Sequence, residues 1–148
     1  MREKKAVLWW VIIGVTMLLI WGLSLFGREM STAQSDAVQG FLGSLFGEWI
    51  YGTLFYQNIR KVAHFAEYAL LGAEWAGYRL TVRGARRPPR WLLFAAGPLT
   101  AVCDEALQFI SARAPMVADV LLDCGGYACG AAVVLGVSWL LKKYSAAK

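Results

Sequence analysis

Ionisable and hydrogen-bonding side chains gather in three short segments of an otherwise apolar chain. They are Lys61, His64, Glu67, Tyr68, Asp104, Glu105, Gln108, Arg113, Asp119 and Asp123. Lysine and arginine bind phosphate and other anions, carboxylates accept hydroxyl or ammonium donors, and a histidine or carboxylate can act as a general base. A charged group at the centre of a membrane helix costs about 2.5–3.5 kcal/mol and usually faces a bundle interior or a water-filled cavity. We therefore expect these ten side chains to share one polar cleft.

The spacing within the first two segments places several of these side chains on one helical face. Lys61, His64 and Tyr68 occur at i, i+3 and i+7, and Asp104 and Gln108 are four residues apart. Residues three, four or seven apart lie on the same side of a helix. Each segment therefore presents its polar groups in one direction.

Glycines continue the polar stripe of the third segment. Asp119, Asp123, Gly126 and Gly130 follow one another at steps of four, three and four residues. Gly126 and Gly130 form a small-xxx-small motif, which lets two membrane helices approach closely. We predict that the two glycines pack against another helix below a polar mouth.

Three functions and one structural role fit these residues. A binding site would use Lys61, Arg113 and protonated His64 for an anionic head such as a lipid phosphate. An enzyme would use His64 or a carboxylate as a general base. A proton- or ion-coupled carrier would relay charge through carboxylates, of which Glu74 alone is expected at greater depth. Without a ligand, the same groups would form ion pairs and hydrogen bonds that lock the helices together.

The sequence carries no recognisable metal or cofactor motif. It has one histidine and no H-E-x-x-H or comparable spacing. Its cysteines lie in apolar stretches without a C-x-x-C or Cys/His pattern; they are Cys103, Cys124 and Cys129. We therefore predict no metal and no cofactor, and the pattern assigns no catalytic residue. The alternative is a divalent cation that activates water, held by His64 with Glu67, Asp104, Glu105 and Asp119.

The composition of the chain is that of a small polytopic membrane protein. Of its 148 residues, 58% are hydrophobic, whereas soluble domains usually reach about 45–50%. This length fits a single domain, residues 1–148, with four spans of roughly 20 residues each and no second soluble domain. The net charge of +5 does not indicate nucleic-acid binding, because the basic residues flank apolar segments.

The apolar segments predict an all-α membrane protein with four transmembrane helices, at about residues 6–26, 61–80, 91–110 and 120–141. The first is too long for the apolar core of a signal peptide. Lysine and arginine gather before the first helix, between the second and third, and after the fourth. The positive-inside rule places these segments, and both termini, in the cytoplasm. We expect a multi-pass protein of the bacterial inner (cytoplasmic) membrane, with its polar segments at the outer leaflet.

The outer loop between the first two predicted helices is expected to contain an amphipathic helix at about residues 36–50. Its apolar residues follow a helical spacing, and Ser35 or Asp36 could cap its start. These apolar residues are Val38, Phe41, Leu42, Leu45, Phe46 and Trp49. The helix either lies in the headgroup region, folds over the bundle, or acts as a lid.

Several motifs together resemble the VanZ family of bacterial membrane proteins. They are RKVAHFAEYALLG (60–72), DEALQ (104–108), Arg113 and DVLLDCGGYACG (119–130), with WGLSLF and the pair Ser31 and Ser35 as weaker members. The resemblance spans about residues 9 to 140, and one departure from it is Asp123, where the family usually carries asparagine. It implies a cell-envelope role linked to low-level teicoplanin resistance. Together with the polar residues, this context gives the expected partners, which are membrane lipids and an envelope lipid or lipoglycopeptide-related ligand.

Overall fold

The computed structural model describes residues 2–26, 28–111 and 116–146, and this part of the chain is helical, with 90% helix and no strand. The long helices are α1 (Arg2–Ser24), α2 (Arg28–Phe46), α4 (Ile59–Thr81), α5 (Arg90–Ile110) and α6 (Val117–Ala146). Short helical turns connect them: η1 (Glu48–Ile50), α3 (Leu54–Gln57) and η2 (Gly84–Arg86). The all-α prediction is thus confirmed for the described residues.

Three helices of the described chain, α1, α5 and α6, are long and apolar enough to cross a membrane. They coincide with three of the four predicted spans. Helix α4 has 23 residues, which is enough to cross a hydrocarbon core of about 30 Å, but it carries the polar residues of the first segment. Its passage through the membrane therefore stays a prediction.

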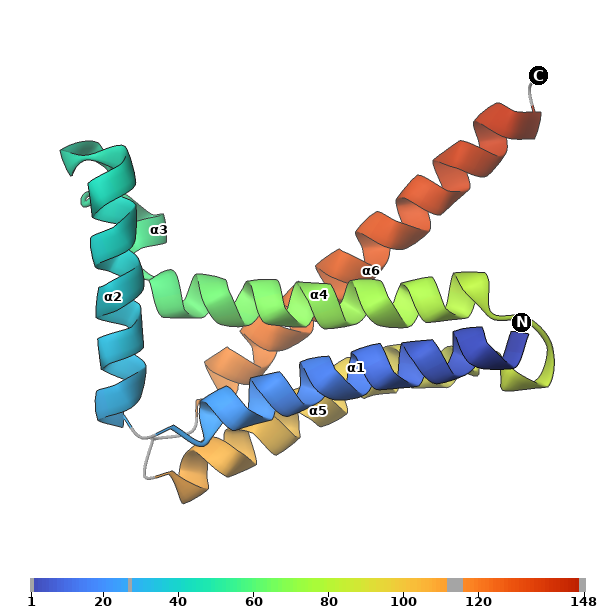
Figure 1. The fold of residues 1–148 in the computed structure, drawn as a ribbon, viewed down its shortest axis with the longest axis horizontal. Coiled ribbons are helices and arrows are strands. Elements are labelled where there is room, and N and C mark those ends of the chain that lie inside the picture. Colours follow the sequence, from blue (N-terminus) through green and yellow to red (C-terminus); the bar gives the residue numbers. More distant parts are fainter. Residues whose placement is uncertain (1, 27, 112–115, 147–148) are drawn as a thin grey trace.

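The centre of the molecule is the crossing of α4 with α6 (Figure 1). Glycines make a close approach possible, because a Cβ at Gly126 would meet the carbonyl oxygen of Phe65 and one at Gly130 would meet that of Ala69. In the other direction, a Cβ at Gly72 would meet the carbonyl oxygen of Tyr127. Both predicted packing glycines thus lie where the backbones of α4 and α6 are in contact. Small residues allow such close contacts between membrane helices.

Helix α1 packs against α4 and α5 through a row of residues spaced by seven, Ala6, Ile13 and Ile20, all of which are buried. Near the middle of this row, the Thr16 hydroxyl donates a 2.8 Å hydrogen bond to Oε1 of Glu74 on α4. Glu74 is buried, and Thr16 is the partner that the sequence did not identify. This polar contact ties α1 to α4 away from the predicted cleft.

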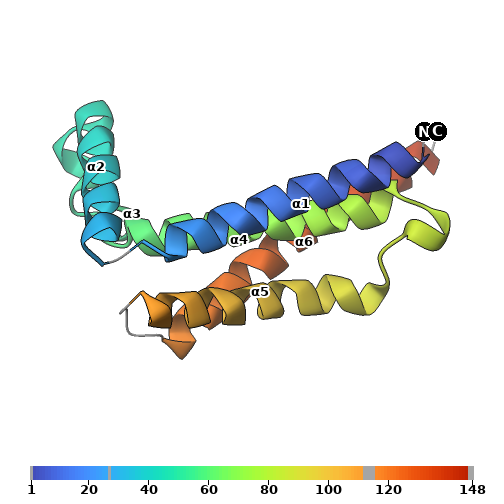
Figure 2. The ribbon, with the colours of Figure 1, turned by 60° about the horizontal axis from the view of Figure 1, so that its bottom comes forward.

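The basic segments and the polar segments lie at opposite ends of the bundle (Figures 1 and 2). The start of α1, the connection between α4 and α5 and the end of α6 share one end, where Arg86 pairs with Glu3 at 2.8 Å. At the other end, α2 runs across the direction of α1 and α4 in both views. The sequence-predicted polar cleft belongs to that second end.

Helix α2 begins earlier than the predicted amphipathic segment 36–50. Ser35 lies inside the helix and its hydroxyl bonds the carbonyl of Ser31 at 3.0 Å. The predicted cap at Ser35 or Asp36 is therefore wrong, because residues 28–35 already form a helix. The helix ends at Phe46, where Gly47 adopts φ 74°, a left-handed conformation that glycine adopts without steric cost.

Candidate functional site

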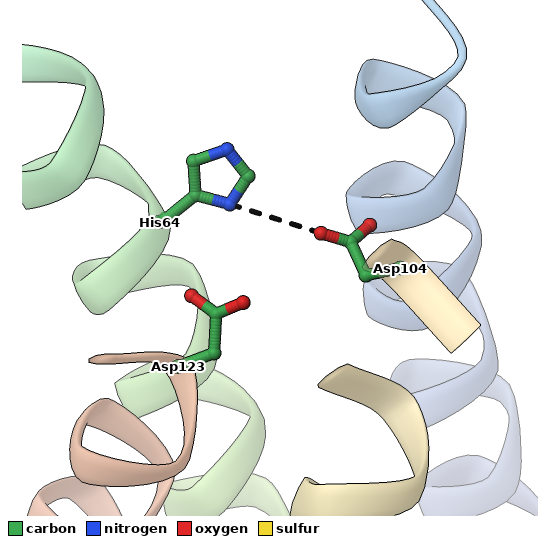
Figure 3. A group of neighbouring side chains, drawn as sticks. All are labelled: His64, Asp104 and Asp123. Carbon is green, nitrogen blue, oxygen red and sulfur yellow. Dashed lines mark ion pairs between the residues drawn. The ribbon is translucent and has the colours of Figure 1, made fainter. Parts of the chain in front are cut away.

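Three helices bring His64, Asp104 and Asp123 together at the end of the bundle that α2 crosses (Figure 3). His64 comes from α4, Asp104 from α5 and Asp123 from α6. His64 Nδ1 lies 3.9 Å from Asp104 Oδ2, and one nitrogen or oxygen atom of each residue lies within 4.8 Å of the others. We call these residues the triad.

Asp104 is held in place by its own helix. Its side chain is completely buried, and Gln108, one turn further along α5, donates a 3.0 Å hydrogen bond from Nε2 to the same Oδ2 atom that faces His64. Such a bond between residues four apart fixes both side chains on one face of the helix. The contact orients Asp104 Oδ2 toward the triad.

Asp123 has no such support. Its side chain is 1% exposed, and neither of its carboxylate oxygens has a hydrogen-bond partner within the described part of the chain. Burying a carboxylate without a partner costs free energy, and buried polar groups in folded proteins are nearly always paired. The triad thus presents an unsatisfied acid group next to a histidine and a second acid.

A cavity of about 500 Å³ opens beside the triad, and we call it the cleft. Side chains of α2, α4, α5 and α6 line it, including two triad members, His64 and Asp123. Two exposed cations, Arg60 and Lys61, also line it. Its volume lies within the range of about 300–1,000 Å³ typical of small-molecule sites. The five predicted residues that line the cleft are Lys61, His64, Gln108, Asp119 and Asp123.

A second cavity of about 550 Å³, which we call the side cavity, lies between α1, α2 and α4. It shares Ser35, Ile59, Arg60 and His64 with the cleft. Its other walls are mostly apolar. They include Leu23, Ala37, Val38, Val62, Ala63 and Ala66. The two cavities together offer polar and apolar surface side by side.

The remaining predicted residues have separate positions. Glu67 lines the side cavity, and Tyr68 is completely buried. Glu105 lines neither cavity. Its Oε2 accepts a 3.1 Å hydrogen bond from the backbone N–H of Met116, just before α6 begins. Glu105 therefore ties α5 to the start of α6. Arg113 lies outside the described residues.

The sequence analysis did not identify Arg60 as a cleft residue, nor the contribution of the polar face of α2. Thr32, Ser35 and Gln39 line the cleft from α2, at the spacing i, i+3, i+7 of one helical face. The helix was predicted from the spacing of its apolar residues alone. The spacing of its polar residues would have indicated that α2 also faces the cleft. Arg60 directly precedes Lys61, and the helix start places both cations at the cleft.

Comparison with known proteins gives one match. No curated protein and no solved structure matches the chain significantly. The model of one protein family, described as VanZ/LLP1, matches residues 9–141, which is most of the chain and includes every residue of the triad. The chain therefore belongs to the VanZ/LLP1 family and is a VanZ-like membrane protein.

Proposed function

We propose that this protein binds an amphiphile of the cell envelope, with the polar head in the cleft and the apolar chain along the side cavity. The observation that carries the proposal is the junction of the two cavities at Arg60 and His64. A lipid or a lipoglycopeptide has the same division into a polar head and an apolar chain. The link to teicoplanin resistance rests on the family resemblance.

An anionic head fits the cations of the cleft best. Apart from His64, the basic residues among the described residues that line the cleft are Arg60 and Lys61. Charge-assisted hydrogen bonds from such groups to phosphate are stronger than neutral ones. Ser35 of α2 and Gln108 of α5 add hydrogen-bonding groups that suit hydroxyl or phosphate oxygens. A phosphate-bearing head is therefore the proposed chemistry.

The proposal places the cleft on the outer side of the inner membrane, with α4 as the fourth span and both termini in the cytoplasm. The separation of the basic ends from the cleft supports this orientation, because basic residues favour the cytoplasmic side. The apolar face of α2 supports it too, since Phe41 and Leu45 are exposed. An amphipathic helix that crosses the bundle direction fits the membrane interface.

Removing both cleft cations should weaken binding of a lipid phosphate by about tenfold or more, since each lost charge-assisted contact is worth roughly 1.5–3 kcal/mol. The test compares Arg60→Ala/Lys61→Ala with the wild type in nanodiscs, using a fluorescent lipid phosphate and its uncharged alcohol. The matched control is Lys142→Ala/Lys143→Ala, which removes two cations at the other end of the bundle.

The binding proposal fails if both double variants bind the lipid phosphate equally well, or if the wild type does not prefer it to the alcohol. Competition with free inorganic phosphate shows whether the head alone is recognised.

A second candidate function, hydrolysis of a lipid phosphate, is favoured by the approach of His64 Nδ1 to Asp104 Oδ2 at 3.9 Å. If the wild type releases phosphate from the same probe and His64→Gln does not, the function is catalysis and not binding alone.

The orientation can be measured by labelling single cysteines with a membrane-impermeant maleimide in intact cells. In a background without the three native cysteines, a cysteine at Gln57 or Asp36 should react from outside. A cysteine at Arg86 should react only after the cells are opened. Labelling at Arg86 in intact cells would contradict the proposed orientation of the cleft.

A further inference from the structure

The triad has the composition of a metal site, although no motif in the sequence indicates one. It offers one imidazole nitrogen and two carboxylate oxygens from three different helices. Donors that share a divalent transition ion at about 2.0–2.2 Å stand roughly 3–4 Å apart. The separations of the triad, all within 4.8 Å, need side-chain movements of only about an ångström to reach that spacing.

The charge of the triad also favours a cation. Asp104 and Asp123 are both buried, and neither forms an ion pair with a lysine or arginine among the described residues. Asp104 has Gln108 and His64 beside it, whereas the Asp123 oxygens have no partner in the described chain. In Figure 3 the Asp123 carboxylate points into the space beneath the His64 ring, where a shared ion would satisfy it.

An ion could reach the triad from the cleft. His64 is 19% exposed, and both His64 and Asp123 line the cleft wall. Three protein donors leave coordination positions free for water or for a ligand in the cleft. The site is thus enclosed on its protein side and accessible on the other.

The geometry points to a divalent-cation site formed by His64, Asp104 and Asp123. One nitrogen and two oxygen donors suit Mn²⁺ or Zn²⁺, because imidazole suits transition metals and carboxylates suit both classes of cation. Asp123 distinguishes this site from the set that sequence alone suggested, which contained Glu67, Glu105 and Asp119 instead. Cation binding does not require the proposed amphiphile, so the metal alone tests it.

Mn²⁺ provides a direct test with the full-length protein in detergent or nanodiscs. After treatment with a chelator and its removal, titration with Mn²⁺ is followed by the loss of the free-ion electron paramagnetic resonance signal. We expect saturable uptake of about one ion per chain and displacement by Zn²⁺, which binds such donors more tightly. His64→Gln and Asp123→Asn should each weaken binding by about tenfold or more, since even indirect ligand supports are worth 10–100-fold.

The matched control is Glu74→Gln. Like Asp104 and Asp123, Glu74 is a buried carboxylate, and it lies on α4. Its Oε1 already accepts a hydrogen bond from Thr16, so loss of the Glu74 charge should leave Mn²⁺ uptake unchanged. Pulsed spectra of the wild type should show coupling of Mn²⁺ to an imidazole nitrogen, and His64→Gln should abolish it. Size-exclusion profiles establish that each variant is folded, and the two triad variants test the site independently.

Three results would overturn the site. The first is a wild type that takes up no Mn²⁺ or Zn²⁺ in a saturable way. The second is uptake that stays unchanged in folded His64→Gln and Asp123→Asn. The third is bound Mn²⁺ without nitrogen coupling, which would place the ion away from His64. Failure of lipid-phosphate binding with normal Mn²⁺ uptake would refute only the proposed function.

Discussion

Gly130→Val should disrupt the packing of α6 on α4 and lower the free energy of unfolding by about 3 kcal/mol or more. Added volume in a packed interior typically costs 1–3 kcal/mol, and the obstacle here is a backbone carbonyl, that of Ala69, which cannot rotate away as a side chain can. We expect a variant that inserts into the membrane but elutes as a broad or aggregated species and loses its cooperative thermal transition.

Gly136→Val is the matched control for this experiment. Gly136 lies on the same helix, and a Cβ there would meet no atom within 4 Å. Valine at this position should leave the unfolding temperature nearly unchanged, because glycine in a helix interior is no better a helix former. Equal stability of the two valine variants would show that α4 and α6 do not approach as described.

Asp123→Asn should raise the stability of the metal-free protein while weakening its response to metal. An unsatisfied buried polar group costs about 1–3 kcal/mol, more when it is charged, and a neutral amide lowers that cost. For a chain of this size, each kcal/mol corresponds to about 2–4 °C in the melting temperature. We therefore expect a rise of about 3 °C or more in the presence of a chelator.

Mn²⁺ at about 100 times the wild-type Kd should reduce or reverse this difference in stability. At that concentration the wild type gains about 2.7 kcal/mol, whereas a variant that binds tenfold or more weakly gains about 1.4 kcal/mol or less. Asp119→Asn is the control, because Asp119 lies in the first turn of α6 and is partly exposed. Its loss should lower stability slightly through the helix dipole. A metal-free Asp123→Asn that melts below the wild type would show that the carboxylate already has a stabilising partner.

Local patterns were enough to predict the helices and the polar faces. Long apolar runs predict α1, α5 and α6 as helices of spanning length, because the thickness of a membrane sets the length of an apolar segment. The spacing of Lys61, His64 and Tyr68 places their side chains toward one side of α4. The glycine spacing of α6 indicated the close helix contact, which the structure describes at Phe65 and Ala69.

Contacts between residues far apart in the chain could not be predicted in this way. Periodicity tells which residues share a face, but it does not tell which helix that face meets. Glu105 and Asp104 are neighbours in sequence, yet Glu105 bonds the Met116 backbone while Asp104 joins the triad. Residues 28–35 extend α2 beyond its predicted start, because the apolar pattern that marked the helix begins only at Val38.

The sequence by itself determined that this is an apolar, helical membrane protein of the VanZ/LLP1 family with a polar end. Composition and helical periodicity are local properties, and they survive in any arrangement of the helices. Only the tertiary structure decided that His64, Asp104 and Asp123 meet. The approach of His64 to Asp123 depends on how closely and in what direction α6 crosses α4, which the glycine contacts between the two backbones set.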